Sequence, residues 1–368
     1  MMRKQFFAGA KSATLGGAAL LLAFSAALLF AYNTFQDNLG TLQAPLPAAS
    51  RWANLPVTWL FNSYTPANNV STTGCSIAPS SCIQQSLANG FTTWISAMVQ
   101  GQSLTDLAVQ YDPTLSSLTA PDVADCKNVV GFSDSASDFS TGTVAFTELA
   151  TVTASQYRCS DGSIKTCPSG SCIADADIEF NPNYTFYTNT VPSGIAFNLQ
   201  SVATHEEGHL LGMDHSGIGH AMMFPFGDTE FSGQPLSLAA DDSIGISSLY
   251  PCVNPGSGPS CTAKFSTATG KISGTVTLNS AGAFGAHVVA IDTATGDVVM
   301  DGLTAPDGSY TLVGVPPGNY HVLVLPLAPD ANSGILLLDD FSGWDCGYGD
   351  SNCSNVPQNP TNYTGRFF

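Results

Sequence analysis

The most constraining feature of this chain is an eleven-residue run at 205–215, His-Glu-Glu-Gly-His-Leu-Leu-Gly-Met-Asp-His. Residues four positions apart on a helix lie one turn apart, so His205 and His209 would present their imidazoles from the same face. Gly212 can adopt the backbone conformation that ends a helix, and the chain can then turn to bring His215 back. The run therefore predicts a helix, a sharp turn and three converging histidines.

Three neutral imidazoles with a fourth position left open are the ligand set of a catalytic zinc ion. The alternative is a surface helix that carries histidines by coincidence, and the spacing argues against it. We expect one catalytic Zn²⁺ held by His205, His209 and His215. Zinc lowers the pKa of its bound water to about 7, and Glu206 is the residue expected to take that water's proton.

The charge balance narrows the class of partner. Ten Lys and Arg residues stand against 28 Asp and Glu, for a net charge of −18. Such a chain repels phosphate backbones, so we expect no nucleic-acid binding. Charged residues make up only 10% of the chain, whereas about 25% is usual. The surface polarity must come from Ser, Thr, Asn and Gly, as is common in secreted proteins.

The N-terminal segment carries the features of an export signal. Arg3, Lys4 and Lys11 precede an uncharged apolar run at 15–32. Its length lies between that of a signal-peptide core and that of a spanning helix, so a cleaved signal and an uncleaved anchor at 1–34 both stay open. In either case we expect an extracellular protein, secreted or tethered through 15–32 to the outer face of the cell membrane.

The cysteines agree with export. All ten lie beyond the N-terminal segment, none has the Cys-x-x-Cys spacing of a zinc knuckle, and no histidine precedes residue 205. In an exported chain, disulfides are the better interpretation. Spacing alone leaves the connectivity open. Pairing between neighbours is plausible for Cys75 with Cys82, Cys167 with Cys172, Cys252 with Cys261 and Cys346 with Cys353, which leaves Cys126 and Cys159 for each other.

Hydrophobic periodicity predicts a first folded unit at 51–251, after a Pro- and Ala-rich linker at 35–50. The chain is long enough for two domains. Apolar residues at helical spacing predict a helix over 83–98, another from the Asn198 cap to Leu211, and a last one over 238–250. Candidate strands lie at 56–61, 104–111, 143–152 and 175–180. The order indicates a sheet with helices packed on it.

The pattern of predicted secondary structure changes after a Pro- and Gly-rich linker at 252–262. Short β-rich runs separated by Gly, Pro and Asp-Gly signals predict a small all-β sandwich at 263–330. The remaining segment, 331–368, is polar and is expected to be a tail. The β-rich runs lie at 272–278, 286–292, 298–300, 310–313 and 320–325.

The long motif resembles the signature of the metzincins, His-Glu-x-x-His-x-x-Gly-x-x-His followed by a methionine turn. Ala221-Met-Met-Phe-Pro225 is similar to the methionine turn of the matrixin branch, which gives Met223 the Met-turn role. Ser216 also fits that branch and argues against another one. Further similarity lies at 176–181 and 238–250, so the resemblance covers about residues 51–250. It implies an α+β fold: a zincin-like domain with a mixed twisted sheet and three main helices.

The resemblance implies a zinc endopeptidase, acting as a monomer on an extended polypeptide. The substrate would pair with an edge strand, for which 143–152 is our candidate. The specificity pocket would be walled by 224–238. Calcium is usual in the family, and the Asp-rich surface allows it, although no ligand set can be named.

Several residues depart from the family or receive ordinary interpretations. The usual structural zinc and the cysteine switch are both expected to be absent, and disulfides are our hypothesis for what replaces the second zinc. Glu207 occupies a usually apolar position and is interpreted as an exposed or supporting acid. We interpret His220 as structural, His287 and His321 as ordinary strand residues, Asp214 as orienting the third histidine, and Asp241 with Asp242 as anchors of the last helix.

The predicted sandwich resembles the carboxypeptidase-regulatory or transthyretin-like domain through Ile272-Ser-Gly-Thr-Val, 285–292, Asp307-Gly-Ser-Tyr and Pro316-Pro-Gly-Asn-Tyr. Such modules support folding or adhesion. The alternative function is therefore a non-catalytic adhesion or binding protein on a degenerate metzincin scaffold. Degenerate scaffolds typically lose the glutamate or a histidine first, and this chain keeps Glu206 and all three histidines.

Overall fold

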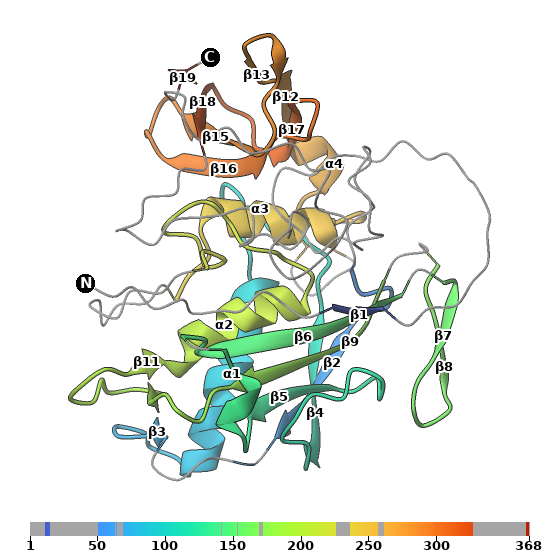
Figure 1. The fold of residues 1–368 in the computed structure, drawn as a ribbon, viewed down its shortest axis with the longest axis vertical. Coiled ribbons are helices and arrows are strands. Elements are labelled where there is room, and N and C mark those ends of the chain that lie inside the picture. The colour runs from blue at the N-terminus through green and yellow to red at the C-terminus, as the bar shows by residue number, and fades with distance from the viewer. Residues whose placement is uncertain are drawn as a thin grey trace.

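The computed structural model describes residues 12–14, 51–62, 64, 69–140, 142–152, 154–168, 172–225, 236–256, 261–326 and 366–367. A large sheet lies at one end of the molecule, helices lie beside it, and smaller sheets lie beyond the third helix (Figure 1). The predicted mixed α+β class is confirmed at this level.

The large sheet has the strand order β1-β6-β9-β5-β2-β4. It is mixed, because β6 and β9 are antiparallel while the other neighbours are parallel. Its strands are β1 (Ser12–Thr14), β2 (Val57–Asn62), β4 (Val109–Ser116), β5 (Asn128–Phe132), β6 (Ala145–Val152) and β9 (Cys172–Phe180).

Three of the four predicted strands are confirmed as β2, β6 and β9. The strand predicted over 104–111 is displaced, because regular pairing starts only at Val109. Leu104 and Leu107 are buried, but the backbone there bonds elsewhere: Thr105 bridges to Pro251, and Leu104 O accepts the N–H of Cys252. Strand β5 was not predicted.

The three predicted helices are confirmed as α1 (Pro79–Ile95), α2 (Leu199–Leu210) and α3 (Ala240–Leu249). Asn198 caps α2 as predicted, because its side chain accepts the N–H of Ser201 at 3.0 Å. Helix α1 buries the predicted apolar stripe from Ile83 to Trp94 against α2 and the sheet, whereas Met98 lies beyond the end of the helix and is exposed. The Trp94 indole N–H donates to Thr204 O at 2.7 Å, which ties α1 to α2 inside one core.

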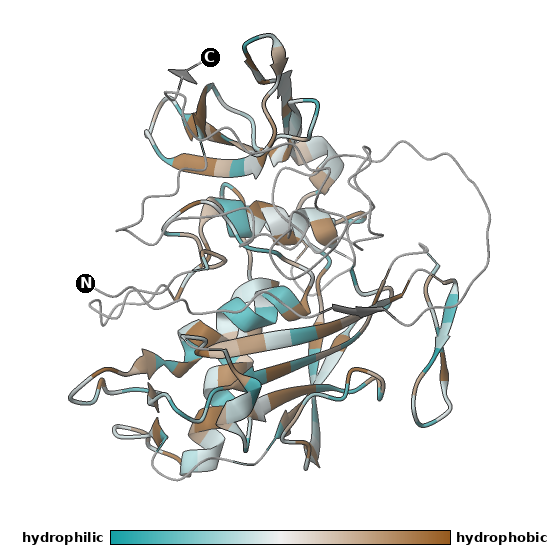
Figure 2. Ribbon diagram, viewed as in Figure 1, coloured by the Kyte–Doolittle hydropathy of each residue, from teal (hydrophilic) through white to brown (hydrophobic). Residues whose placement is uncertain are grey.

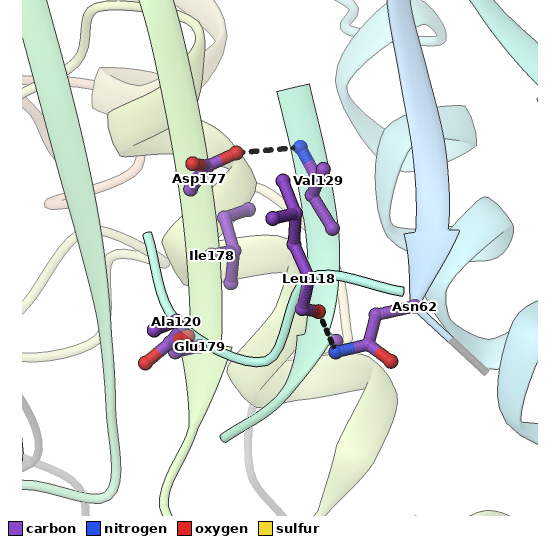
Figure 3. Close-up of a pocket in the computed structure, with 8 residues that line it drawn as sticks. Asn62, Leu118, Ala120, Val129, Asp177, Ile178 and Glu179 are labelled. Carbon is purple, nitrogen blue, oxygen red and sulfur yellow. Dashed lines mark hydrogen bonds between the residues drawn. The ribbon is translucent and has the colours of Figure 1, made fainter. Parts of the chain in front are cut away.

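The face of β9 that points away from this core carries an acidic stripe, Asp175, Asp177 and Glu179. All three are buried. Figure 2 shows that hydrophilic segments interrupt the mainly hydrophobic strands of the large sheet. Asp177 accepts the N–H of Val129 at 2.7 Å, drawn in Figure 3, and that of Asp122 at 2.8 Å. Burial raises the pKa of Asp175 to about 8, of Asp177 to about 7 and of Glu179 to about 8.

Residues 270–326, called here the C-terminal β unit, form short sheets beyond α3 (Figure 1). The β-rich runs predicted there are confirmed as strands. Its strands are β12 (Gly270–Thr275), β13 (Thr277–Leu278), β14 (Ala281–Gly282), β15 (Ala286–Asp292), β16 (Val298–Leu303), β17 (Ser309–Val315) and β18 (Tyr320–Pro326), and β19 (Arg366–Phe367) pairs with β18.

The remaining elements are small. They comprise β3 (Val70–Ser71), β10 (Phe186–Tyr187) and β11 (Phe197–Asn198) in one sheet, the β7 (Gln156–Arg158) and β8 (Ile164–Thr166) hairpin, the turn η1 (Ala136–Asp138) and the short helix α4 (Phe265–Ala268).

Four disulfides hold the described part of the chain. Three join the predicted neighbours Cys75–Cys82, Cys167–Cys172 and Cys252–Cys261, and the fourth joins Cys126 to Cys159. Cys346 and Cys353 lie outside the described residues. The hypothesis of a disulfide framework is confirmed for the eight described cysteines.

The export segment is almost entirely outside the described residues. Only Ser12–Thr14 is described, and it pairs in parallel with residues 149–151 of β6. Among the residues that the structure describes, no helix has the length and apolar character that a membrane crossing requires.

Candidate metal centre

Helix α2 positions the first two histidines, and its end positions the third. His205 and His209 lie one turn apart, and the helix stops where Gly212 adopts φ 99°. This left-handed conformation favours glycine, as the motif predicts. The chain then reverses, and the structure brings His205, His209 and His215 together as a buried group able to hold a metal ion.

Backbone acceptors set the orientation of two rings. His205 Nδ1 lies 2.7 Å from Met222 O, and His209 Nδ1 lies 2.9 Å from Met213 O. A carbonyl oxygen can only accept, so each Nδ1 carries the proton and each Nε2 keeps a lone pair. Burial lowers the pKa of both histidines well below the usual range, so both rings are neutral.

The three Nε2 atoms converge. Those of His205 and His209 are 3.1 Å apart, and those of His209 and His215 are 3.2 Å apart. Lone pairs facing one another at this distance repel unless a cation lies between them. Tetrahedral zinc with Zn–N bonds of about 2.0–2.1 Å places its nitrogen ligands about 3.3 Å apart. The donor set and its spacing fit such an ion.

Glu206 follows His205 on α2, and its carboxylate has one hydrogen-bonded oxygen and one oxygen without a partner. Its Oε2 accepts the hydroxyl of Thr147 on β6 at 2.7 Å, whereas Oε1 is buried with no hydrogen-bond partner. Burial raises the pKa of this carboxyl to about 8, and the Thr147 bond acts in the opposite direction. A buried oxygen without a hydrogen-bond partner is destabilising. A water bound at the open coordination position of a metal ion would supply the partner that Oε1 lacks. No sequence motif pointed to Thr147.

The methionine turn packs directly beneath α2. Met223 is fully buried, and a Cβ added at Gly208 would lie 2.3 Å from its sulfur and 2.6 Å from the Trp94 ring. Gly208 therefore lets the turn approach the helix between the two histidines. Ser216 donates its N–H to Met223 O at 2.9 Å, which joins the turn to the loop that carries His215.

The two aspartates at the start of α3 bond this loop and this turn. Asp242 accepts the N–H groups of Met222 at 2.8 Å and Met223 at 3.1 Å. Asp241 accepts the hydroxyl of Ser216 at 2.8 Å. Burial raises the pKa of Asp242 to about 6, while the backbone bonds act against the rise. The anchoring interpretation of this pair agrees with these contacts.

Glu207 differs from its interpretation as an exposed or supporting acid. It is fully buried, and both carboxylate oxygens lack a hydrogen-bond partner. A Cβ added at Gly90 of α1 would lie 2.2 Å from Glu207 Oε2, so the side chain is directed at α1. Burial raises its pKa well above the usual range. The Glu207 side chain fills space between two helices.

Other predicted residues lie in different surroundings. Asp214 accepts the N–H of His215 at 2.8 Å, which fits an orienting role for this acid. His220 is exposed and lies outside the three-histidine group. His287 is not an ordinary strand residue, because its Nε2 lies 2.6 Å from Asp301 Oδ2. Most of the predicted pocket wall, 226–235, lies outside the described residues.

Comparison with known proteins identifies the class to which this site corresponds. Residues 132–251, about a third of the chain, match the matrixin family, peptidase M10. The matched region contains all three histidines, Glu206 and the methionine turn. The match to the matrixin family and the three-histidine group together support a zinc metalloprotease.

Individual relatives carry the same similarity. The chain is 38% identical to stromelysin-3 of Xenopus laevis over 81 residues, which is 22% of this chain and 16% of the relative. It is 41% identical to metalloendoproteinase 1 of Glycine max over 86 residues, 23% of this chain and 27% of the relative. It is 38% identical to karilysin of Tannerella forsythia over 68 residues, 18% of this chain and 14% of the relative. The chain thus spans less than a third of the length of each of these relatives.

Proposed function

We propose that this protein is a zinc-dependent endopeptidase of the matrixin type. The observation that carries the proposal is the convergence of the three histidine Nε2 atoms on the helix that also carries Glu206 with its unpartnered Oε1. His205, His209 and His215 are the proposed ligands of one zinc ion, and Met223 is the proposed Met-turn residue beneath it.

A zinc ion held there would polarise the scissile carbonyl and acidify a water. Glu206 then acts as the general base: its Oε1 takes the proton of the attacking water and later gives it to the departing amine. The Thr147 hydroxyl holds the other carboxylate oxygen at 2.7 Å, so Oε1 is the atom left to move the proton. A bound cation also favours the ionised form of Glu206 and so opposes the effect of burial on its pKa.

The proposed substrate is an extended polypeptide that pairs with β6. Thr147 on this strand touches Glu206, so a peptide laid along the strand would pass next to the proposed base. Among the described strands, residues 145–148 pair only with β9, while β1 pairs with 149–151. We propose 224–238 as the wall of the specificity pocket.

The wider setting of the enzyme is also a proposal. The disulfides and the scarcity of lysine and arginine support a secreted protein, or one tethered through 15–32 to the outer face of the membrane. We propose a monomer with a transthyretin-like sandwich in its C-terminal β unit. Calcium binding stays a hypothesis from the acidic composition, without a named ligand set.

The second candidate is a non-catalytic adhesion protein on a degenerate metzincin scaffold. The C-terminal β unit favours it, since modules of that kind serve adhesion. The intact histidine group and the unpartnered Oε1 of Glu206 favour the enzyme.

The two candidates are separated by substituting adjacent glutamates. Glu206→Gln removes the proposed base, and hydrolysis of an unstructured protein by the full chain should fall about 10²–10⁴-fold with one zinc still bound. Glu207→Gln is the matched control, because this side chain points at α1, and it should stay within about threefold of wild type. Equal hydrolysis by the Glu206→Gln and wild-type chains would refute the assigned role. A wild-type chain that binds zinc and cleaves nothing would favour the adhesion protein.

A further inference from the structure

The C-terminal β unit shares an apolar core with the part of the chain that carries the histidines. Val99, Leu104 and Ile244 lie in one buried cluster with residues of β15, β16, β17 and β18. The contact with α3 is close, since a Cβ added at Gly314 of β17 would lie 2.7 Å from Ile244. The β unit is therefore fixed against α3, the helix whose first turn holds the methionine turn and the His215 loop.

A chain of polar contacts runs from the β unit to that loop. Asp301 on β16 donates its N–H to Asp241 Oδ1 at 3.2 Å. The other oxygen of Asp241 accepts the hydroxyl of Ser216, the residue that follows the third histidine. The Asp301 side chain is only 2% exposed, and its Oδ2 lies 2.6 Å from His287 Nε2 of the neighbouring strand β15.

The same pair also packs on the loop itself. A Cβ added at Gly217 would lie 2.3 Å from Asp301 Oδ2 and 2.6 Å from His287 Nε2. Gly217 does not have a positive φ, so the need for glycine at this position comes from the pair alone. Two residues further on, a Cβ at Gly219 would meet nothing within 4 Å.

We propose that His287 and Asp301 are positioning residues for the metal centre. The backbone N–H of Asp301 bonds Asp241, and the side chains of Asp301 and His287 both pack on Gly217. Together these contacts hold the loop that places His215 within reach of the other two histidines. The inference rests on the proposed zinc site, and it makes the C-terminal β unit part of the support of that site instead of an appended module. Their effect on His215 passes through residues 216 and 217.

The test measures zinc affinity in the full chain by competition with a chromophoric chelator, together with the visible spectrum of the cobalt-substituted protein. Gly217→Ala should weaken zinc binding about tenfold or more and change the cobalt spectrum, as losses of support behind metal ligands do. Gly219→Ala is the matched control and should leave both unchanged. A melting curve for each variant separates misplacement of the loop from loss of fold.

A second variant tests the contact directly. Asp301→Ala removes the atom nearest to the added methyl group, so Gly217→Ala should weaken zinc binding much less in that background than in wild type. The inference is overturned if Gly217→Ala binds zinc and cobalt like wild type, or if the losses of the two single variants multiply in the double variant. A wild-type chain that binds no zinc would instead overturn the proposed function, and this inference with it.

Discussion

At the scale of single residues, the adjacent glutamates Glu206 and Glu207 of α2 lie in different surroundings and have different proposed roles. Glu206 faces β6, where Thr147 donates a hydrogen bond to one of its oxygens. Glu207 lies about 100° further round the helix and faces Gly90 of α1, where both its oxygens lack a partner. A buried polar atom without a hydrogen bond is destabilising, so Glu207 weakens the fold.

Replacing Glu207 by methionine should therefore stabilise the protein. The two side chains are similar in size, and the thioether needs no hydrogen bond. We expect the free energy of unfolding to rise by about 1–3 kcal/mol, measured by denaturant titration, with peptide hydrolysis kept. Glu207→Gln should gain less, because its amide still lacks partners. A Met variant less stable than wild type would show that Glu207 has a role beyond filling this space.

At the scale of secondary-structure elements, the acidic stripe of β9 makes stability depend on pH. Its three carboxyls have pKa values raised by burial to about 7–8. The folded state thus keeps protons that the unfolded state releases near pH 4. Their contribution is fully present below the unfolded pKa and is lost as the pH rises through about 7–8.

Glu179→Gln tests this dependence at one position. Glutamine cannot ionise, so the variant avoids the loss at high pH. The melting temperature of the variant minus that of wild type should be about 3 °C more positive at pH 9 than at pH 5, with zinc saturating. Asp297→Asn changes an exposed acid and should give the same difference at both pH values. A Glu179→Gln difference that does not grow with pH would contradict the proposed protonated stripe.

Local patterns account for the elements that the sequence predicted. The apolar periodicity from Ile83 to Trp94 predicts α1, and the capping residue Asn198 predicts the start of α2. The metal group was equally readable, because its three histidines lie on one helix and the turn after it. Strand β5 is too short and too uniformly apolar to show alternation. Thr147 lies 59 residues from Glu206, and Asp301 lies 60 residues from Asp241, so no local pattern indicated either contact.

At the scale of the whole molecule, the chain joins two cores through α3. One core lies between the large sheet, α1 and α2, and the other lies in the C-terminal β unit and includes Ile244 of α3. Composition suggested a linker at 252–262 and separate domains. The shared cluster shows that the two cores meet at the helix that supports the metal centre.

The disulfides and the groups of potential metal ligands together indicate how many zinc ions the chain binds. Three of the four described disulfides close short loops, and Cys126–Cys159 joins positions 33 residues apart. The only other group of potential ligands among the described residues is Asp106 with Cys252 and Cys261. Those two sulfurs are joined to each other and offer no thiolate. We therefore expect one zinc ion per chain, with disulfides in place of a second.

The central claim, that one three-histidine zinc centre performs peptide hydrolysis, is tested most directly by returning zinc to the metal-free full chain. Hydrolysis of an unstructured protein is measured after each addition. The account predicts no hydrolysis without metal, a rise in proportion to the zinc added, and a plateau at one equivalent per chain. A plateau at two equivalents, or hydrolysis by the metal-free chain, would contradict it.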